Sequence, residues 1–104
     1  MLFGVLMHYT QPLDAVNAVR VEHVRHLESY AARGLIHAWA RREPPTGGLF
    51  IATAPDRVTL EAVVAEDPYI RAGVATAEIV EVRASSTSSP TRFSKPYSSS
   101  AQVR

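Results

Sequence analysis

Short apolar runs alternate with amphipathic stretches along the first 83 residues of the chain. Four of the apolar runs have the length of a β-strand and are bounded by turn-forming residues. The third of them follows a loop, 43–48, that combines Pro-Pro with Gly-Gly, two pairs that interrupt regular structure. The pattern therefore predicts strands at residues 2–9, 35–41, 49–53 and 74–83.

Two helices are predicted between these strands. The first begins at Asp14, whose carboxylate can accept hydrogen bonds from the first free N–H groups. It ends at Arg33, because the glycine that follows supplies a C-terminal stop. The second has Asp56 as its cap and ends just before Asp67, since a residue that precedes proline is pushed out of the α region.

The predicted order of elements is β-α-β-β-α-β. This order indicates an α+β fold of the ferredoxin-like type, in which both helices lie on one face of a four-stranded antiparallel sheet. Side chains alternate between the two faces of a strand. In the first predicted strand both sets are apolar, the one that contains Val5 and the one that contains Leu6, so both faces of this strand are apolar. Two helices cover only one face, so we expect a second copy of the chain to cover the other in an isologous homodimer.

A histidine interrupts the apolar stripe of the first predicted helix. At about 100° per residue, Val16, Val19 and Leu27 fall on one side of the helix and define the stripe that faces the core. His23 falls at the centre of this stripe, where a leucine would be expected, and Arg20 also lies inside it. A titratable group is therefore predicted in the core.

A carboxylate occupies a similar place on the second predicted helix. Asp67 lies on the same side as Leu60 and Val64, the apolar face of that helix. Because both helices pack on one face of the sheet, Asp67 and His23 are expected to converge. Buried charged groups are costly unless they are paired, which makes a contact between the two side chains physically reasonable.

Two interpretations of this pair remain open from the residues alone. In the first, Asp67 accepts a hydrogen bond from one ring nitrogen of His23 and fixes its tautomer, while the other nitrogen acts as general base or acid in a pocket. In the second, His23 is a core histidine satisfied by a backbone carbonyl, and Asp67 only caps the turn before Pro68. Spacing alone favours the second interpretation.

Composition limits the class of protein. The chain has 104 residues, 46% of them hydrophobic and 20% charged, as in one ordinary globular domain. It contains no cysteine, which excludes a disulfide scaffold and a thiolate metal site. No apolar run reaches the roughly 18 residues of a membrane-spanning helix, and the first residues do not resemble a signal peptide, so a cytoplasmic location is expected and no membrane partner.

Charge is divided unevenly along the chain. Residues 1–83 contain 8 basic and 10 acidic side chains, whereas residues 84–104 contain 3 basic side chains, no acidic one and 8 serines. A nucleic-acid-binding domain would carry its positive charge on the folded part, so nucleic acid is not expected as a partner. We therefore predict one domain at 1–83 and a Ser-rich basic tail at 84–104, either disordered or an arm that contacts a partner subunit.

The remaining histidines do not form a metal-binding motif. Neither His-x-x-x-His nor His-Glu-x-x-His occurs, and although His23 and His26 are three residues apart, His26 points partly outward. His8 is expected at a strand end, either solvated or near the mouth of a pocket. Trp39, predicted on the same face of its strand as His37, is expected in the core or in a dimer contact. No metal and no other cofactor are expected.

Several segments of the chain match one family pattern. They are Arg20-Val-Glu-His23-Val-x-x-Leu27, Gly34-Leu35, Gly48 at the start of a strand, and Ala65-Glu66-Asp67-Pro68-Tyr69-Ile-x-Ala72-Gly73-Val74. Together they resemble the YCII-related (YciI-like) family over roughly residues 1–83. The chain departs from the family pattern after the second strand, where Ala40-Arg41 replaces a frequent Gly-Pro.

The resemblance implies a dimeric α+β barrel built from ferredoxin-like subunits. It also implies that His23 and Asp67 form a catalytic pair in a cleft, which makes the first interpretation of this pair the favoured one. Some members of the family are thought to remove a leaving group from cyclic hydroxylated substrates, a lyase type of reaction without a cofactor.

We therefore expect a small cofactor-independent enzyme of the lyase or isomerase type. Its His23–Asp67 dyad would abstract a proton from a compact cyclic substrate that is enolic, phenolic or quinone-like, leading to elimination, dehydration or isomerisation. The alternative is a non-catalytic dimeric module that binds a small ligand or a partner through the same cleft. Four residues are expected to bind the small-molecule substrate: Arg20, Tyr69, Tyr30 and His8.

Overall fold

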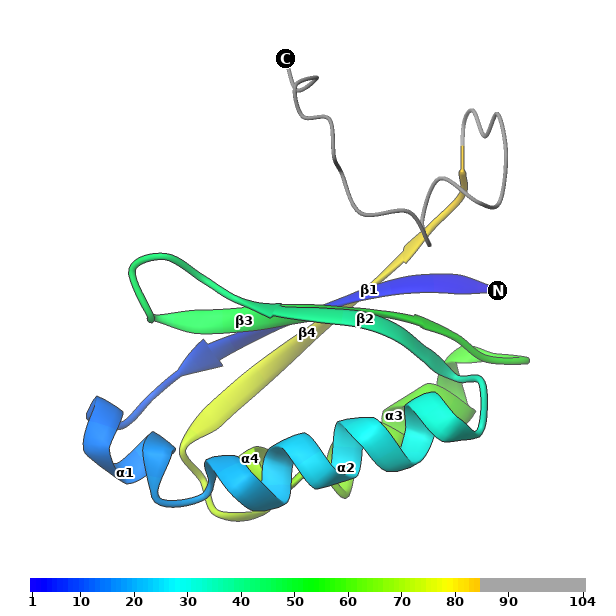
Figure 1. Ribbon diagram of the computed structural model, residues 1–104. Helices are drawn as coiled ribbons and strands as arrows, with labels where there is room; N and C mark the ends of the chain where they lie inside the picture. The colour runs from blue at the N-terminus through cyan, green and yellow to red at the C-terminus, as the bar shows by residue number, and fades with distance from the viewer. Residues whose placement is uncertain (85–104) are drawn as a thin grey trace, which may run out of the picture.

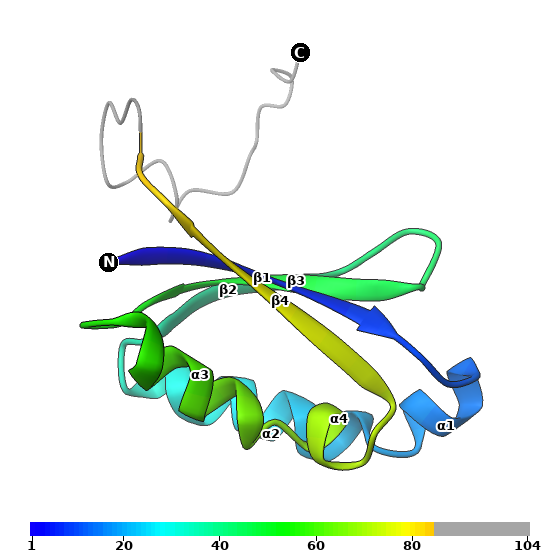
Figure 2. The ribbon, with the colours of Figure 1, turned by 180° about the vertical axis from the view of Figure 1, so that it is seen from behind.

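The computed structural model describes residues 1–84 of the chain. Its four strands form one antiparallel sheet in the order β2-β3-β1-β4, and all the helices lie on one side of that sheet (Figure 1, Figure 2). This is the predicted ferredoxin-like α+β fold. The predicted tail lies, except for residue 84, outside the described residues. The elements are β1 (Leu2–Tyr9), α1 (Leu13–Asn17), α2 (Arg20–Ala32), β2 (Ile36–Arg41), β3 (Gly47–Thr53), α3 (Arg57–Ala65), α4 (Pro68–Arg71) and β4 (Ala75–Val82).

Strand β3 begins two residues earlier than predicted. Gly47 and Gly48 were expected in a loop, but they pair with His8 and Met7 of β1. A Cβ atom on Gly47 would collide with the carbonyl oxygen of Met7. Glycine is therefore required here by the close approach of two backbones rather than by a turn.

The first predicted helix is divided in two. Helix α1 begins after Pro12, not at Asp14, whose carboxylate accepts a hydrogen bond from the N–H of Ala15 instead of capping the helix. The chain leaves helical geometry at Val19 (φ −109°, ψ 1°) before α2 starts. The break places Asn17 at the C-terminal end of α1, where it contacts the sheet, as described below.

The second predicted helix is confirmed, and a short further helix follows it. Asp56 caps α3 by accepting a hydrogen bond from the N–H of Thr59 at 2.8 Å. Asp67 ends α3 as predicted, but it also caps α4, whose first residue is Pro68. Proline suits this first helical position because its missing N–H would have no partner there and its φ is already helical.

The core lies between the sheet and the helix layer. Phe3 and Val5 of β1 are fully buried against the helices, together with Leu60 of α3. The opposite face of the sheet is also apolar, as the alternation in β1 predicts. It leaves four large hydrophobic side chains 38–42% exposed: Leu6, Leu49, Val80 and Val82.

A β-bulge changes the direction of side chains in β2. The register with β3 shifts between Ile36 and Ala38, so Trp39 is opposite the inward-facing Phe50. The ring of His37 instead meets the hydroxyl of Thr53 at 2.8 Å, on the other side of the sheet. The prediction that His37 and Trp39 share a face is therefore wrong, because the bulge interrupts the period of two.

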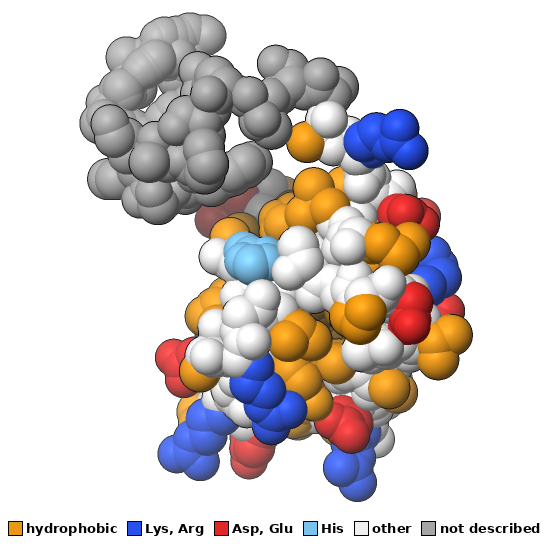
Figure 3. Space-filling view, turned by 90° about the vertical axis from the view of Figure 1, so that its right-hand side faces the viewer, with side chains coloured by type: hydrophobic (Ala, Val, Ile, Leu, Met, Phe, Trp, Pro, Cys, Tyr) orange, Lys and Arg blue, Asp and Glu red, His pale blue; other side chains and the backbone are white. Residues whose placement is uncertain are grey.

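Acidic, basic and hydrophobic side chains are interspersed at the end of the molecule seen in Figure 3. Within residues 1–84, none of the helices combines the length and the apolar character needed to cross a membrane.

Candidate active site

The structure brings His23 and Asp67 into direct contact. Nδ1 of His23 lies 2.8 Å from Oδ1 and 3.0 Å from Oδ2 of Asp67. His23 is 9% exposed and Asp67 1% exposed. A carboxylate can only accept, so Nδ1 carries the proton and donates. In the neutral ring Nε2 is then unprotonated, which is the form that can act as a base.

Asp67 is held in place by the backbone that follows it. Its Oδ1 also accepts a hydrogen bond from the N–H of Tyr69 at 2.8 Å, the N-cap bond of α4. The sequence left two interpretations of Asp67 open: a partner of His23 and a cap before Pro68. In the structure this residue is both. The cap fixes the carboxylate, and the carboxylate in turn fixes the imidazole.

Tyr69 forms one wall beside the histidine. Its ring stacks on the His23 ring with centroids 3.8 Å apart and planes 8° from parallel. Tyr69 is 2% exposed, and its hydroxyl is a buried polar group that has no hydrogen-bond partner among the described residues. Burial raises the pKa of the Tyr69 phenol and the nearby Tyr9 adds to this, while Arg20 and Arg41 act in the opposite direction. Tyr69 is therefore a hydrogen-bond donor at neutral pH.

The raised pKa of Tyr69 predicts a loss of stability in alkali. In the unfolded chain this phenol ionises near pH 10, whereas the folded chain keeps it protonated to higher pH. The difference does not change the free energy of unfolding below about pH 10, but it lowers that free energy as the pH rises above about 10. Tyr69→Phe should reduce the fall in the urea midpoint between about pH 8 and pH 11. A variant that loses as much stability over this range as the wild type would contradict the prediction.

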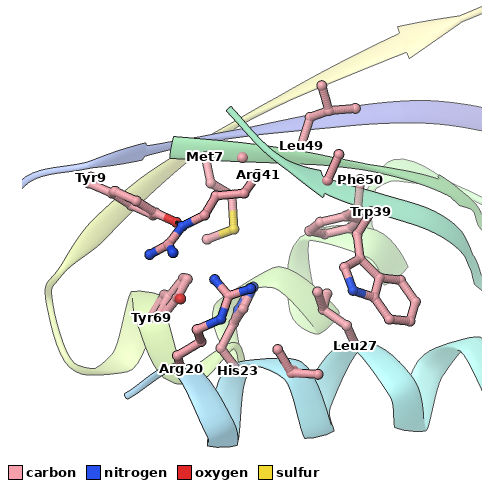
Figure 4. Close-up of a pocket in the computed structure, with 13 residues that line it drawn as sticks. Met7, Tyr9, Arg20, His23, Leu27, Trp39, Arg41, Leu49, Phe50 and Tyr69 are labelled. Carbon is pink, nitrogen blue, oxygen red and sulfur yellow. Dashed lines mark hydrogen bonds between the residues drawn. The ribbon is translucent and has the colours of Figure 1, made fainter. Parts of the chain in front are cut away.

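A pocket opens in front of the dyad, between α2 and the sheet (Figure 4). Its cavity measures about 40 Å³, room for about two waters, whereas a six-membered ring needs on the order of 150 Å³. Ring binding therefore requires side chains at the mouth to move, and Trp39 is 40% exposed there. The lining residues are Met7, Tyr9, Arg20, His23, Val24, Leu27, Trp39, Ala40, Arg41, Gly48, Leu49, Phe50 and Tyr69.

Two arginines reach the pocket from opposite sides. Arg20 is exposed, although it was predicted inside the apolar stripe, and it extends from the first turn of α2 beside His23. Arg41 extends from the end of β2, and Figure 4 shows both guanidinium groups in the opening between α2 and the sheet. The Nε of Arg41 donates to the hydroxyl of Tyr9 at 3.1 Å, and its Nη2 donates to Oδ1 of Asn17 at 2.7 Å.

Two of the predicted substrate-binding residues lie elsewhere. The hydroxyl of Tyr30 donates to Glu66 at 3.0 Å, and its ring lies between His26 and Arg33 rather than in the pocket. His8 is on the outer face of the sheet, 4.0 Å from Glu78. The predictions for Tyr30 and His8 rested on the position of each residue along its helix or strand. That position does not show at which end of the sheet the pocket opens.

Sequence reasoning missed Tyr9 and Arg41 as pocket residues. Each stands at the end of a strand, where the alternation of faces gives the weakest signal. The signal for Arg41 was its departure from the family pattern, since Ala40-Arg41 stands where the family frequently has Gly-Pro. Within the part of the chain that the structure describes, no three His, Asp or Glu side chains are grouped in a way that could hold a metal ion.

Comparison with known proteins supports the fold. Several solved structures are similar, and two of them each match over 80% of this chain. One, with 20% identity and a TM-score of 0.68 over 94% of its own length, is a 5-chloro-2-hydroxyhydroquinone dehydrochlorinase from Burkholderia phenoliruptrix in complex with 2,5-dihydroxybenzoquinone. The other, with 19% identity and a TM-score of 0.51 over 99% of its length, is an antibiotic biosynthesis monooxygenase. At these identities the likeness concerns the fold.

Sequence comparison gives the family. No curated protein matches the chain. The model of the YCII-related domain matches residues 1–83, which comprise all the strands and helices described above. The chain therefore belongs to the YCII-related domain family.

Proposed function

We propose that this protein is a small enzyme of the lyase or isomerase type in which His23 transfers a proton and Asp67 holds it in place. The observation that carries the proposal is the contact of Nδ1 with both oxygens of a buried carboxylate. In residues 1–84, Nε2 of His23 has no hydrogen-bond partner, and His23 lines the pocket. A base oriented in this way can raise the rate of proton transfer by a factor of about 10² to 10⁴.

A hydroxylated ring with a leaving group is the substrate that suits this pair best. Nε2 accepts the proton of a ring hydroxyl, and the oxygen electrons form a C=O bond. The protonated His23 can return that proton to the ring carbon that carries the leaving group. The leaving group then departs with its bonding electrons while a second hydroxyl loses its proton, so the net change is loss of H–X and no oxidant is needed.

The structural neighbour supports this class of substrate. It is named as a dehydrochlorinase of a chlorinated hydroxyhydroquinone and was solved with a dihydroxybenzoquinone bound. Both are compact oxygenated rings, the smallest class of ring substrate that the pocket could take once the side chains at its mouth move. Dehydration and isomerisation share the same first proton transfer and remain within the proposal.

The proposal can be tested with the purified full chain. 5-Chloro-2-hydroxyhydroquinone, the substrate in the neighbour's name, and other chlorinated hydroquinones, with and without a ring carboxylate, are supplied anaerobically, and quinone absorbance and free chloride are both recorded. We expect equal amounts of quinone and chloride above the uncatalysed rate with at least one ring. Saturable binding without turnover would instead favour the second candidate, a non-catalytic module that binds small ligands through this pocket.

We also propose that two chains form a homodimer through the outer face of the sheet. The four exposed hydrophobic side chains on that face, including Leu6 and Val80, have no cover from the helix layer. Glu78 lies beside Leu6 on this face, but four large hydrophobic side chains exposed together on one sheet face are uncommon on a monomer. A second copy would bury the same face on both chains.

Leu6→Lys should convert the dimer to a monomer, because it places a charge at the centre of the apolar face. Sedimentation velocity should give the mass of two chains for the wild type and of one chain for the variant. Val58→Lys is the matched control, since Val58 is 73% exposed on α3, in the helix layer, and its replacement should leave the mass unchanged. A wild-type chain that sediments as a monomer at high concentration would overturn the dimer.

A further inference from the structure

The pocket contains two positive charges and no acidic side chain to balance them. Arg20 and Arg41 both line it, and none of the thirteen lining residues is Asp or Glu. Asp67 lies behind the histidine and is engaged by Nδ1 of His23. Among residues 1–84, neither arginine has a carboxylate within ion-pair distance. The pocket therefore offers an uncompensated positive potential to whatever enters it.

Arg41 is held in one position by neutral partners. Its Nη2 is fixed by Asn17 at the end of α1, and its Nε is fixed by the hydroxyl of Tyr9 at the end of β1. These contacts orient the guanidinium without cancelling its charge, and they leave Nη1 free in the described part of the chain. A planar guanidinium that is oriented in advance loses less conformational entropy when it binds an oxyanion.

Two phenols supply further donors. The hydroxyl of Tyr9 accepts from Arg41, so its own proton remains available for a ligand. The hydroxyl of Tyr69 is buried and without a partner among the described residues, and the Tyr69 ring cannot turn freely because it is stacked on His23 and meets the edge of Tyr9 at 5.8 Å. A buried donor without an acceptor is costly, so the Tyr69 hydroxyl needs an acceptor from the pocket, which is a water when the pocket is empty and an oxygen of the ligand when one binds.

We infer that Arg41, Arg20, Tyr9 and Tyr69 form a carboxylate-binding subsite, so that the substrate is a hydroxylated ring that carries a carboxylate. The inference rests on the proposed function for the hydroxyl that His23 deprotonates. A carboxylate suits four convergent donor groups because its two oxygens accept up to about four hydrogen bonds, and it matches the planar fork of arginine. A neutral ring would leave the guanidinium groups of Arg20 and Arg41 without an anionic partner.

Arg41 would then determine substrate specificity. Arg20 belongs to the segment that matches the family, whereas Arg41 stands where the family often has Gly-Pro. The mouth of the pocket has to widen for a ring to bind, and Arg20 and Trp39 are exposed side chains that can move.

Binding of two matched probes tests the subsite. 4-Hydroxybenzoate and 4-hydroxybenzamide have nearly the same shape and differ in charge, and neither carries a leaving group, so the measurement is independent of turnover. NMR titration of the full chain, followed at the His23 and Trp39 ring resonances, gives both dissociation constants. We expect the carboxylate to bind at least about tenfold more tightly than the amide, and the preference to weaken with added salt.

Variants test which residue causes the preference for the carboxylate over the amide. Arg41→Gln should reduce it to less than about threefold, whereas Arg42→Gln removes the same charge from an exposed neighbour outside the pocket and should preserve it. Because neither probe can react, a failure of the dyad as a catalyst leaves this result unaffected. If the wild type binds the two probes equally, or binds neither at millimolar concentration, the inference is overturned whether or not the variants fold.

Discussion

Replacing His23 with alanine is expected to reduce kcat by a factor of about 10² to 10⁴, the usual contribution of a positioned general base. The variant removes the pocket-lining ring whose Nδ1 is fixed by Asp67. KM should change much less, because the arginines and tyrosines that contact the substrate remain. The measurement is kcat and KM with the chlorinated hydroquinone that the wild type converts fastest.

His26→Ala provides the matched control for this prediction. His26 lies on the same helix, three residues away, but its Nε2 donates to the backbone carbonyl of Val63 at 3.0 Å and it does not line the pocket. Its removal should leave kcat within about threefold of the wild type. Equal activity of His23→Ala and the wild type would show that His23 is not the base, and the proposed mechanism would then be wrong.

Replacing Asp67 with alanine is expected to cost about 2–5 kcal/mol in the free energy of unfolding. The variant leaves two buried donors without an acceptor, Nδ1 of His23 and the N–H of Tyr69, and it removes the cap of α4. Asp67→Asn should cost less, since the amide oxygen can still accept from Tyr69, but it should lower kcat because the imidazole can adopt the wrong tautomer. Urea unfolding and long-range ¹H–¹⁵N spectra of the imidazole measure the two effects.

Glu66→Ala is the control for the stability measurement. Glu66 is the preceding residue, is exposed, and accepts a single hydrogen bond from Tyr30. Its loss should cost no more than about 1 kcal/mol. If Asp67→Ala were as stable as Glu66→Ala, the contact between Asp67 and His23 would not be part of the folded state in solution.

The sheet and the convergence of His23 with Asp67 follow from local patterns. Apolar alternation defines the strands, and the step from Asp67 to Pro68 ends a helix wherever it occurs. The helical period then places His23 on the buried side of α2 without any knowledge of tertiary structure. These signals act over a few residues, which is why the sequence alone is sufficient for them.

The positively charged half of the pocket depends on contacts between distant segments. Tyr9, Asn17 and Arg41 come from three elements, and they meet only because α1 is separated from α2 and β2 ends beside β3. The bulge in β2 likewise cannot be read from alternation, because it is the position at which alternation fails. Helix α4 was missed since four residues are too few to show a period.

One oxygen atom of Asp67, Oδ1, both caps α4 and holds the ring of His23 in place. The chain therefore has a reason to retain this aspartate that is independent of catalysis. The histidine has one as well, because its Nδ1–H satisfies a carboxylate that is only 1% exposed. An apolar residue in place of His23 would keep the cap of α4 but leave that buried carboxylate without its side-chain partner, so the two residues are easier to replace together than one at a time.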